Sequence, residues 1–87
     1  MALVSLVGID QAGGVINGPG APGWTWNGAP ISVVGDGVTG HGAGAHAGPA
    51  MATGSAWMSI NGIPVVRAGD VATCTHQATG SSQMDID

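Results

Sequence analysis

Three histidines and one cysteine are the side chains of this sequence best suited to chemistry. They occur in two pairs, His41 with His46 and Cys74 with His76. Imidazole nitrogens and thiolate sulfur are common zinc ligands, and a closed tetrahedral zinc site requires four of them. We therefore predict one metal site formed by all four residues and occupied by Zn²⁺. Iron is the alternative, because imidazole also binds iron and a thiolate does not exclude it.

The four residues also have ordinary interpretations. Their spacing is not that of a zinc finger, and residues 40–50 have the glycine- and alanine-rich composition of a flexible linker. A lone cysteine is often a small buried hydrophobic residue. The sequence around the ligands favours the metal interpretation, because Gly40-His41 and Cys74-Thr75-His76 begin the same few residues after a Gly-Asp pair. Both segments would then bring ligands to the same end of the fold.

Catalytic interpretations of these residues are weaker. A hydrolytic zinc site usually keeps an open coordination position beside a glutamate or similar base, and the chain has no Glu. Cys74 and His76 could form a nucleophile and base pair, but residues two apart on a strand share a face without being placed for proton transfer. No glycine motif follows a strand and opens a helix, as a phosphate cradle would. We expect no enzymatic activity.

The composition indicates one folded domain over residues 1–87. The chain has 17 Gly and 5 Pro, yet 44% of its residues are hydrophobic and its net charge is only -4, so it is not typical of a disordered protein. A domain this small makes a marginal core, and one cysteine cannot form an internal disulfide. Extra stability must therefore come from a metal, from oligomerisation or from a partner.

Charge and hydropathy exclude several partners and indicate the starting compartment. Arg67 is the one permanent cation among the side chains, which excludes nucleic-acid binding and a polybasic membrane patch. The apolar residues 1–9 lack the positive segment and the length of a signal peptide. We expect the protein to be made in the cytoplasm without a signal peptide.

The elements that must position the ligands are hairpins. Residues 24–30, followed by Gly-Asp at 35–36, are copied by residues 58–64, followed by Gly-Asp at 69–70, so that Asn61 repeats Asn27 at an offset of 34. Residues 78–87 repeat residues 52–61 at an offset of 26. Asn-Gly favours a tight turn between two strands. We predict an all-β fold of short hairpins with three strand units joined by glycine-rich loops.

The sequence of residues 52–70 resembles the proline-alanine-alanine-arginine (PAAR) repeat proteins, through a hydrophobic strand, Asn61-Gly62-Ile63-Pro64, Arg67 and Gly69-Asp70. Residues 23–36 match the same frame with Val33 in place of the arginine, and the resemblance extends from about residue 13 to residue 87. It implies a small cone of hairpins with pseudo-threefold symmetry. Its vertex would be stapled by a metal bound to three histidines and one cysteine, here His41, His46, Cys74 and His76.

The resemblance also implies a partner. Members of this family cap a trimeric β-helical spike, which is the valine-glycine repeat protein of type VI secretion systems or the central spike of a contractile phage tail or pyocin. The tip would end on a secretion apparatus or a virion tail, would carry effector cargo in some systems, and would contact the target envelope only transiently. The alternative is a free-standing zinc-binding or metal-sensing domain.

Apolar residues of the three strand units are the candidates for contact with the spike, although core packing is the ordinary role for each. Trp57 is a further candidate. Asp10, Asp36 and Asp70 are expected to stabilise turns, and Asp36 or Asp70 could instead accept a hydrogen bond from a ligating histidine. The N-terminal ten residues match the family poorly and have no predicted path. The spike-contact candidates are Trp24, Trp26, Met58, Ile60, Met84 and Ile86.

Overall fold

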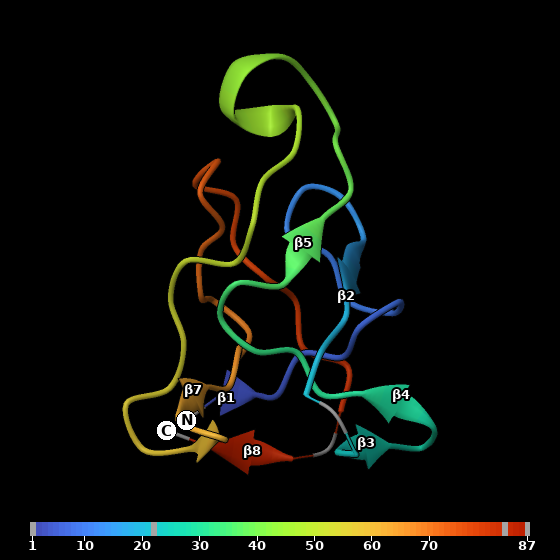
Figure 1. Cartoon of the computed structure of the whole chain (residues 1–87), viewed down its shortest axis with the longest axis vertical. Helices are drawn as coiled ribbons and strands as arrows, with labels where there is room; N and C mark the ends of the chain where they lie inside the picture. Colours follow the sequence, from blue (N-terminus) through green and yellow to red (C-terminus); the bar gives the residue numbers. More distant parts are fainter. Residues whose placement is uncertain (1, 22, 83, 87) are drawn as a thin grey trace.

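Very short strands joined by turns build this fold. The computed structural model describes residues 2–21, 23–82 and 84–86, and the molecule measures 32 × 23 × 21 Å. It is broad at the end that holds most strands and narrow at the other end, where a 3-10 helix η1 (Gly44–His46) lies (Figure 1). No helix in the described ranges has the length and apolar character needed to cross a membrane. The prediction of an all-β fold is confirmed.

Within the described residues the strands pair in four antiparallel sets of two. Three sets lie at the broad end and one lies nearer the narrow end (Figure 1). Their bounds are β1 (Ala2–Leu3) with β8 (Asp85–Ile86), β3 (Thr25–Trp26) with β4 (Ala29–Pro30), β6 (Ser59–Ile60) with β7 (Ile63–Pro64), and β2 (Ile16–Gly18) with β5 (Gly37–Val38).

Two of the broad-end hairpins turn at Asn-Gly, as predicted. Asn27 and Gly28 have φ of 51° and 85°, and Asn61 and Gly62 have φ of 54° and 80°. Positive φ at both central residues is the requirement of the type I′ turn, which matches the twist of the strands that it joins. The Asn-Gly signal therefore located both turns.

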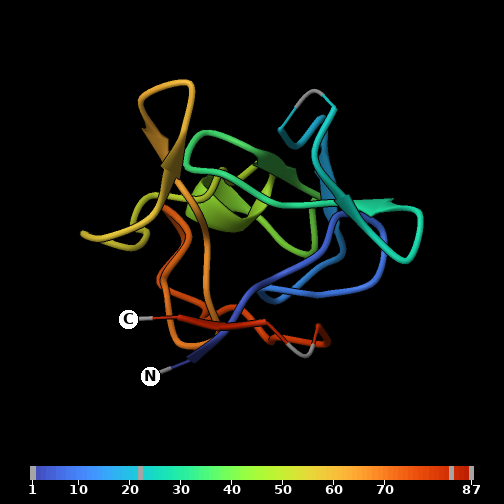
Figure 2. The same ribbon diagram turned by 90° about the horizontal axis from the view of Figure 1, so that it is seen from below.

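The third broad-end pair, β1 with β8, is formed by the two ends of the chain, and we count it as a third hairpin although no turn joins its two strands. Ala2 pairs with Ile86 and Leu3 with Asp85, in the same way as Trp26 pairs with Ala29 and Thr25 with Pro30. Viewed from the broad end, the three hairpins point outward in three directions around the middle of the molecule (Figure 2). Gln83 and Asp87, which belong to the predicted unit 78–87, lie outside the described residues.

A closed ring of backbone hydrogen bonds lies at the centre of this arrangement. Ser5 N donates to Val66 O, Val66 N donates to Ser32 O, and Ser32 N donates to Ser5 O, over 2.9 to 3.0 Å. A second set of three bonds joins the same segments in the opposite order, from donors two residues after the ring residues to acceptors two residues before them: Val7 N donates to Pro30 O, Val34 N to Pro64 O, and Ala68 N to Leu3 O. Three segments far apart in sequence are thus joined in equivalent ways.

The N-terminal residues supply one of these three segments. Val4-Ser5-Leu6-Val7-Gly8 occupies the place that residues 31–35 and 65–69 occupy in the other two. The sequence carried a signal for this, because Ile31-Ser32-Val33-Val34-Gly35 repeats the five residues closely at an offset of 27. In the N-terminal copy Ile9 stands between the glycine and the aspartate, so this copy has one residue more.

Successive side chains of the three central segments point to opposite sides, as expected for extended chain. They therefore divide the core into two layers. Val4, Leu6, Ile31, Val33 and Val65 face the broad end, with Ala21, Ala29 and Ile60, and we call this cluster the base layer. The upper layer lies toward the narrow end, and its buried members are Ala12, Ile16, Val38, Met51, Val66, Ala72, Cys74 and Ala78.

Each central segment ends in a turn that is held by a buried aspartate. Asp10 Oδ2 accepts Leu6 N, Asp36 Oδ2 accepts Val33 N over 3.0 Å, and Asp70 Oδ2 accepts Arg67 N over 2.7 Å. The second carboxylate oxygen of each aspartate binds the segment beside it, through Thr79 Oγ1, Gly20 N and Thr53 Oγ1 respectively. The predicted turn role of the three acids is therefore what the hydrogen bonds show.

Arg67 adds an ion pair to the turn held by Asp70. Its Nε lies 3.0 Å from Asp70 Oδ2 and its second terminal nitrogen lies 3.1 Å from Oδ1, so the pair is bidentate. Burial raises the pKa of the Asp70 carboxyl, but hydrogen bonds from Arg67 and Thr53 and the charge of Arg67 outweigh it, and the pKa lies below its ordinary value of 3.8. Arg67 and Asp70 thus form an ion pair within one turn.

Asp70→Asn is expected to destabilise the protein by about 1.5 to 3 kcal/mol at pH 7, because it removes charged hydrogen bonds. Since the pKa of Asp70 is lowered by folding, its contribution is present above pH 3.8 and is lost as the pH falls through the folded value. The difference in the free energy of unfolding between wild type and variant should therefore shrink in acid, as urea titrations at several pH values can measure. Asp85→Asn, at an exposed position of β8, is the control for the loss of one charge. A difference that stays constant with pH would contradict this prediction.

Candidate metal centre

Three loops project from the central ring toward the narrow end. Each loop leaves after one of the turn aspartates and returns at a residue whose N–H donates to the carbonyl of that aspartate: Ile16 to Asp10, Met51 to Asp36 and Ala78 to Asp70. The first loop covers residues 11–15, the second 37–50 and the third 71–77. The same frame therefore carries three loops of very different length.

The second loop brings His41 and His46 together. His41 N donates to His46 O over 2.8 Å, across the turn that contains η1. Close approach of the two sides depends on glycine at position 40, where a Cβ would lie 2.3 Å from Ala47 O. The glycine-rich composition that suggested a flexible linker is here the requirement of a tight loop.

The third loop turns sharply between Cys74 and His76. Thr75 has φ of 73°, its N donates to Ala72 O over 2.9 Å, and Ala72 N donates to His76 O over 3.0 Å. Residues 72–76 form a turn rather than a strand. The turn, and not a shared face of a strand, therefore brings Cys74 and His76 to the same point. Cys74 is 3% exposed and belongs to the upper layer, whereas His76 is exposed.

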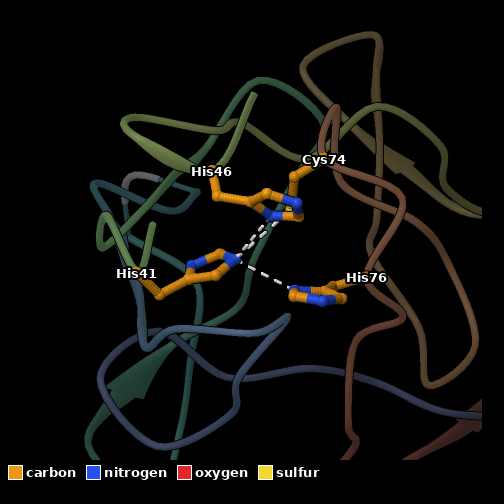
Figure 3. Close-up of side chains that lie close together, drawn as sticks. All are labelled: His41, His46, Cys74 and His76. Carbon is orange, nitrogen blue, oxygen red and sulfur yellow. Dashed lines mark hydrogen bonds between the residues drawn. The ribbon is translucent and has the colours of Figure 1, made fainter. Parts of the chain in front are cut away.

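The four predicted ligands meet between the second and third loops (Figure 3). His41 Nε2 lies 2.9 Å from His76 Nδ1, 3.1 Å from His46 Nδ1 and 3.7 Å from Cys74 Sγ. All four ligand atoms lie within 4.8 Å of one another. Zinc bond lengths and tetrahedral angles require separations of about 3.3 Å between two nitrogens and about 3.6 Å between nitrogen and sulfur. The cluster could hold a metal ion once its wider pairs of ligand atoms, which lie up to 4.8 Å apart, draw closer together.

The His41 ring is oriented by a backbone carbonyl. Its Nδ1 lies 3.0 Å from Thr39 O, and only a protonated nitrogen can donate to a carbonyl. A neutral ring with Nδ1–H leaves the lone pair of Nε2 free, and Nε2 is the atom that faces the other ligands. The geometry therefore selects the tautomer that a metal needs.

The suggested alternative role of Asp36 or Asp70 beside a ligating histidine is wrong. Asp36 accepts from Ser32 Oγ, Val33 N and Gly20 N, and Asp70 accepts from Arg67 and Thr53. These acids stand at the roots of the loops and the histidines at their tips. Thr39 O has the role that was assigned to them.

The first loop contributes no ligand, in agreement with the absence of histidine from residues 8–14. Its tip nevertheless reaches the cluster, because a Cβ on Gly13 would fall 1.8 Å from His76 Nδ1. Sequence reasoning assigned no role to Gly13. The only signal was its position in the short loop that follows Asp10, and the chain has 17 glycines.

The candidates for contact with a spike occupy different depths at the broad end. Trp24 is 52% exposed and Trp57 is 82% exposed. Trp26, Met58, Met84 and Ile86 are partly buried against the base layer. Ile60 is 5% exposed and lies within the base layer, so core packing is the role that its geometry supports.

Chemically, the cluster is suited to crosslinking two loops. Two candidate ligands come from the second loop and two from the third, so a metal would join segments 28 to 35 residues apart in sequence, as Cys74 Sγ and His41 Nε2 already do by contact. Four protein ligands fill a tetrahedral site and leave no position for substrate. Metal binding would thus stabilise the narrow end.

Cys74→Ser is expected to weaken Co²⁺ binding by more than about 10-fold, since even the loss of an outer partner of a ligand costs roughly 10- to 100-fold. It should also abolish the absorption band that arises from charge transfer between thiolate and cobalt. A titration followed by absorption spectroscopy measures both. Ala78→Ser places a hydroxyl in the same upper layer, leaves all four candidate ligands in the sequence and serves as the control. An unchanged band in Cys74→Ser would show that the sulfur is not a ligand.

A strong chelator is expected to lower the melting temperature of protein prepared with metal, because metal bound only by the folded state adds its binding free energy to stability. The scan is run with and without the chelator for wild type and for His41→Ala. The variant lacks the central ligand of the cluster and should respond little. Equal responses of the two proteins would contradict a metal at this site.

Comparison with known proteins does not identify a family for the chain. No protein-family model matches it, and no curated protein matches its sequence. The site and the central ring are the features of the chain itself from which a function can be argued.

Proposed function

We propose that this protein is the tip of a contractile injection machine, where it caps a trimeric β-helical spike and sharpens it. The observation that carries the proposal is the closed ring of Ser5, Ser32 and Val66. The ring lets one chain present three similar hairpins at one end, while the metal-ligand cluster lies at the opposite, narrow end. This combination is the one that a single tip on a threefold shaft requires, and it agrees with the resemblance to PAAR repeat proteins.

The surface proposed to meet the spike is the broad end. Leu3, Trp24, Trp57 and Ile63 are large apolar residues with 37%, 52%, 82% and 42% exposure, and all four lie in or beside the broad-end hairpins. Large exposed apolar groups in one region are typical of interaction surfaces. Two-stranded hairpins also have unpaired outer edges to which another strand can add, and the chain has no Lys to protect them.

The narrow end is proposed to be stiffened by Zn²⁺. Three imidazoles and one thiolate suit zinc, and the ligand separations of 2.9, 3.1 and 3.7 Å are close to those of a tetrahedral site. The loops around the cluster have little side-chain mass, so a metal would replace an apolar core there. Iron remains the second candidate for the metal.

The proposed role is structural rather than enzymatic. Support comes from a site with four candidate protein ligands, which would leave no coordination position open. The sequence also contains no Glu that could act as the base of a hydrolytic site. The protein would be made in the cytoplasm, assembled on the spike with or without effector cargo, and driven through the target envelope. A free-standing zinc-binding or metal-sensing domain is the competing function, and it would show weak, reversible metal binding and a stable metal-free form.

Ile63→Asp is expected to weaken binding to the spike by at least about 10-fold, because it places a charge on the apolar surface proposed to be covered. Ile9→Asp is the matched control, since Ile9 is 54% exposed but lies outside the hairpins, in the turn before Asp10. The binding partner is the β-helical end of the trimeric spike protein encoded in the same genome, and native mass spectrometry measures the ratio of the chains.

One copy of this protein for three copies of the spike chain is the expected stoichiometry. A monodisperse monomer that does not bind the spike, or a ratio of three to three, would overturn the proposed function. Equal weakening by both aspartate variants would show that the broad end is not the contact surface.

A further inference from the structure

We propose that Gly13 is a positioning residue of the metal centre, which allows His76 to act as the fourth ligand because it has no side chain. The proposal concerns the loop that supplies no ligand. It rests on the metal-binding part of the proposed function and not on the spike.

The tip of the first loop lies against two of the ligand rings. A Cβ added to Gly13 would lie 1.8 Å from His76 Nδ1, 2.6 Å from His41 Nε2 and 2.8 Å from His41 Cε1. Real Cβ atoms do not approach other atoms so closely. The two nitrogens are the same atoms that face each other across 2.9 Å in the cluster. The volume that a side chain at position 13 would fill is therefore the volume in which the ligands converge.

The first loop cannot easily withdraw from this position. Thr79 N donates to Gln11 O over 2.9 Å, and Ala12 N donates to Gly14 O over 2.9 Å. Ala12 is 0% exposed and belongs to the upper layer. On the other side, a Cβ on Gly14 would lie 2.2 Å from Thr39 O, so the loop is already in close contact with the second loop. A side chain at position 13 must be accommodated by the ligands.

Among the ligands next to Gly13, His76 is the one that can move. The His41 ring is held by Thr39 O at 3.0 Å on its Nδ1 side. His76 is exposed, so its ring can rotate into solvent. A methyl group at position 13 should then remove His76 from the ligand set and leave His41, His46 and Cys74, with the fourth position open to water. Gly13 thus keeps the number of protein ligands at four, and a methyl group at this position would reduce it to three.

The test is a Co²⁺ titration, followed by absorption spectroscopy, of wild type, Gly13→Ala, His76→Ala and the double variant. Gly13→Ala is expected to weaken Co²⁺ binding by at least about 10-fold and to give the spectrum of His76→Ala, while keeping the thiolate charge-transfer band. In the double variant the added alanine should weaken binding far less than it does in wild type, since the ring that it displaces is already absent.

The matched control is Gly8→Ala. Gly8 has φ of 82°, close to the 85° of Gly13, but a Cβ there would have no atom within 4 Å. It reproduces the backbone strain of alanine at positive φ without the contact with the ligands. Gly8→Ala should bind Co²⁺ as wild type does and should give the wild-type spectrum.

The outcomes separate the inference from the proposed function. Failure of wild type to bind Co²⁺ overturns both the metal centre and the role of Gly13. Binding by wild type with equal behaviour of Gly13→Ala and Gly8→Ala overturns the role of Gly13 alone. The role of Gly13 is also overturned if Gly13→Ala weakens Co²⁺ binding equally with and without the His76 imidazole, or prevents folding in both backgrounds. In either case the effect would not act through His76.

Discussion

The fold depends on the closed cycle of backbone hydrogen bonds through Ser5, Ser32 and Val66. A strand in an ordinary sheet has a free edge unless another strand covers it, and here three segments cover one another in turn. Buried backbone groups of a chain with few large side chains are thereby paired at its centre. The apolar layers on either side, the aspartate turns and the loops all take their positions from this cycle.

Above the cycle the three units differ in the length of their loops, and the candidate metal centre depends on this difference. The frame returns each loop at an equivalent residue, yet the loops run over 11–15, 37–50 and 71–77. The long loop provides two candidate ligands, the intermediate one provides two, and the short one places Gly13 against two of their rings. Three identical loops would place the same side chains around the axis three times. Loops that differ in length and sequence let each unit contribute different residues to one site.

Features with a local cause could be read from the sequence, and features with a distant cause could not. The pairs Asn27-Gly28 and Asn61-Gly62 each predict a turn from two neighbouring residues. The four candidate ligands are conspicuous because His and Cys are rare in the chain. The N-terminal segment was missed because its hairpin partner lies at the opposite end of the chain and because Ile9 changes its offset from the next copy. Gly13 was missed because the role proposed for it lies in the absence of a side chain, which a residue type alone does not reveal.

The resemblance among the three hairpins is close in backbone and loose in side chains, and this has a consequence for assembly. Trp24, Met58 and Met84 occupy equivalent positions, since each accepts through its carbonyl the N–H of Ile31, Val65 or Val4. The proposed spike, with its threefold symmetry, would receive the chain in three rotational settings that present similar backbone and differ in such residues. Images averaged over the axis would keep the ring sharp and blur the three loops into one another. The rotational setting of the tip would be recorded only in data processed without symmetry.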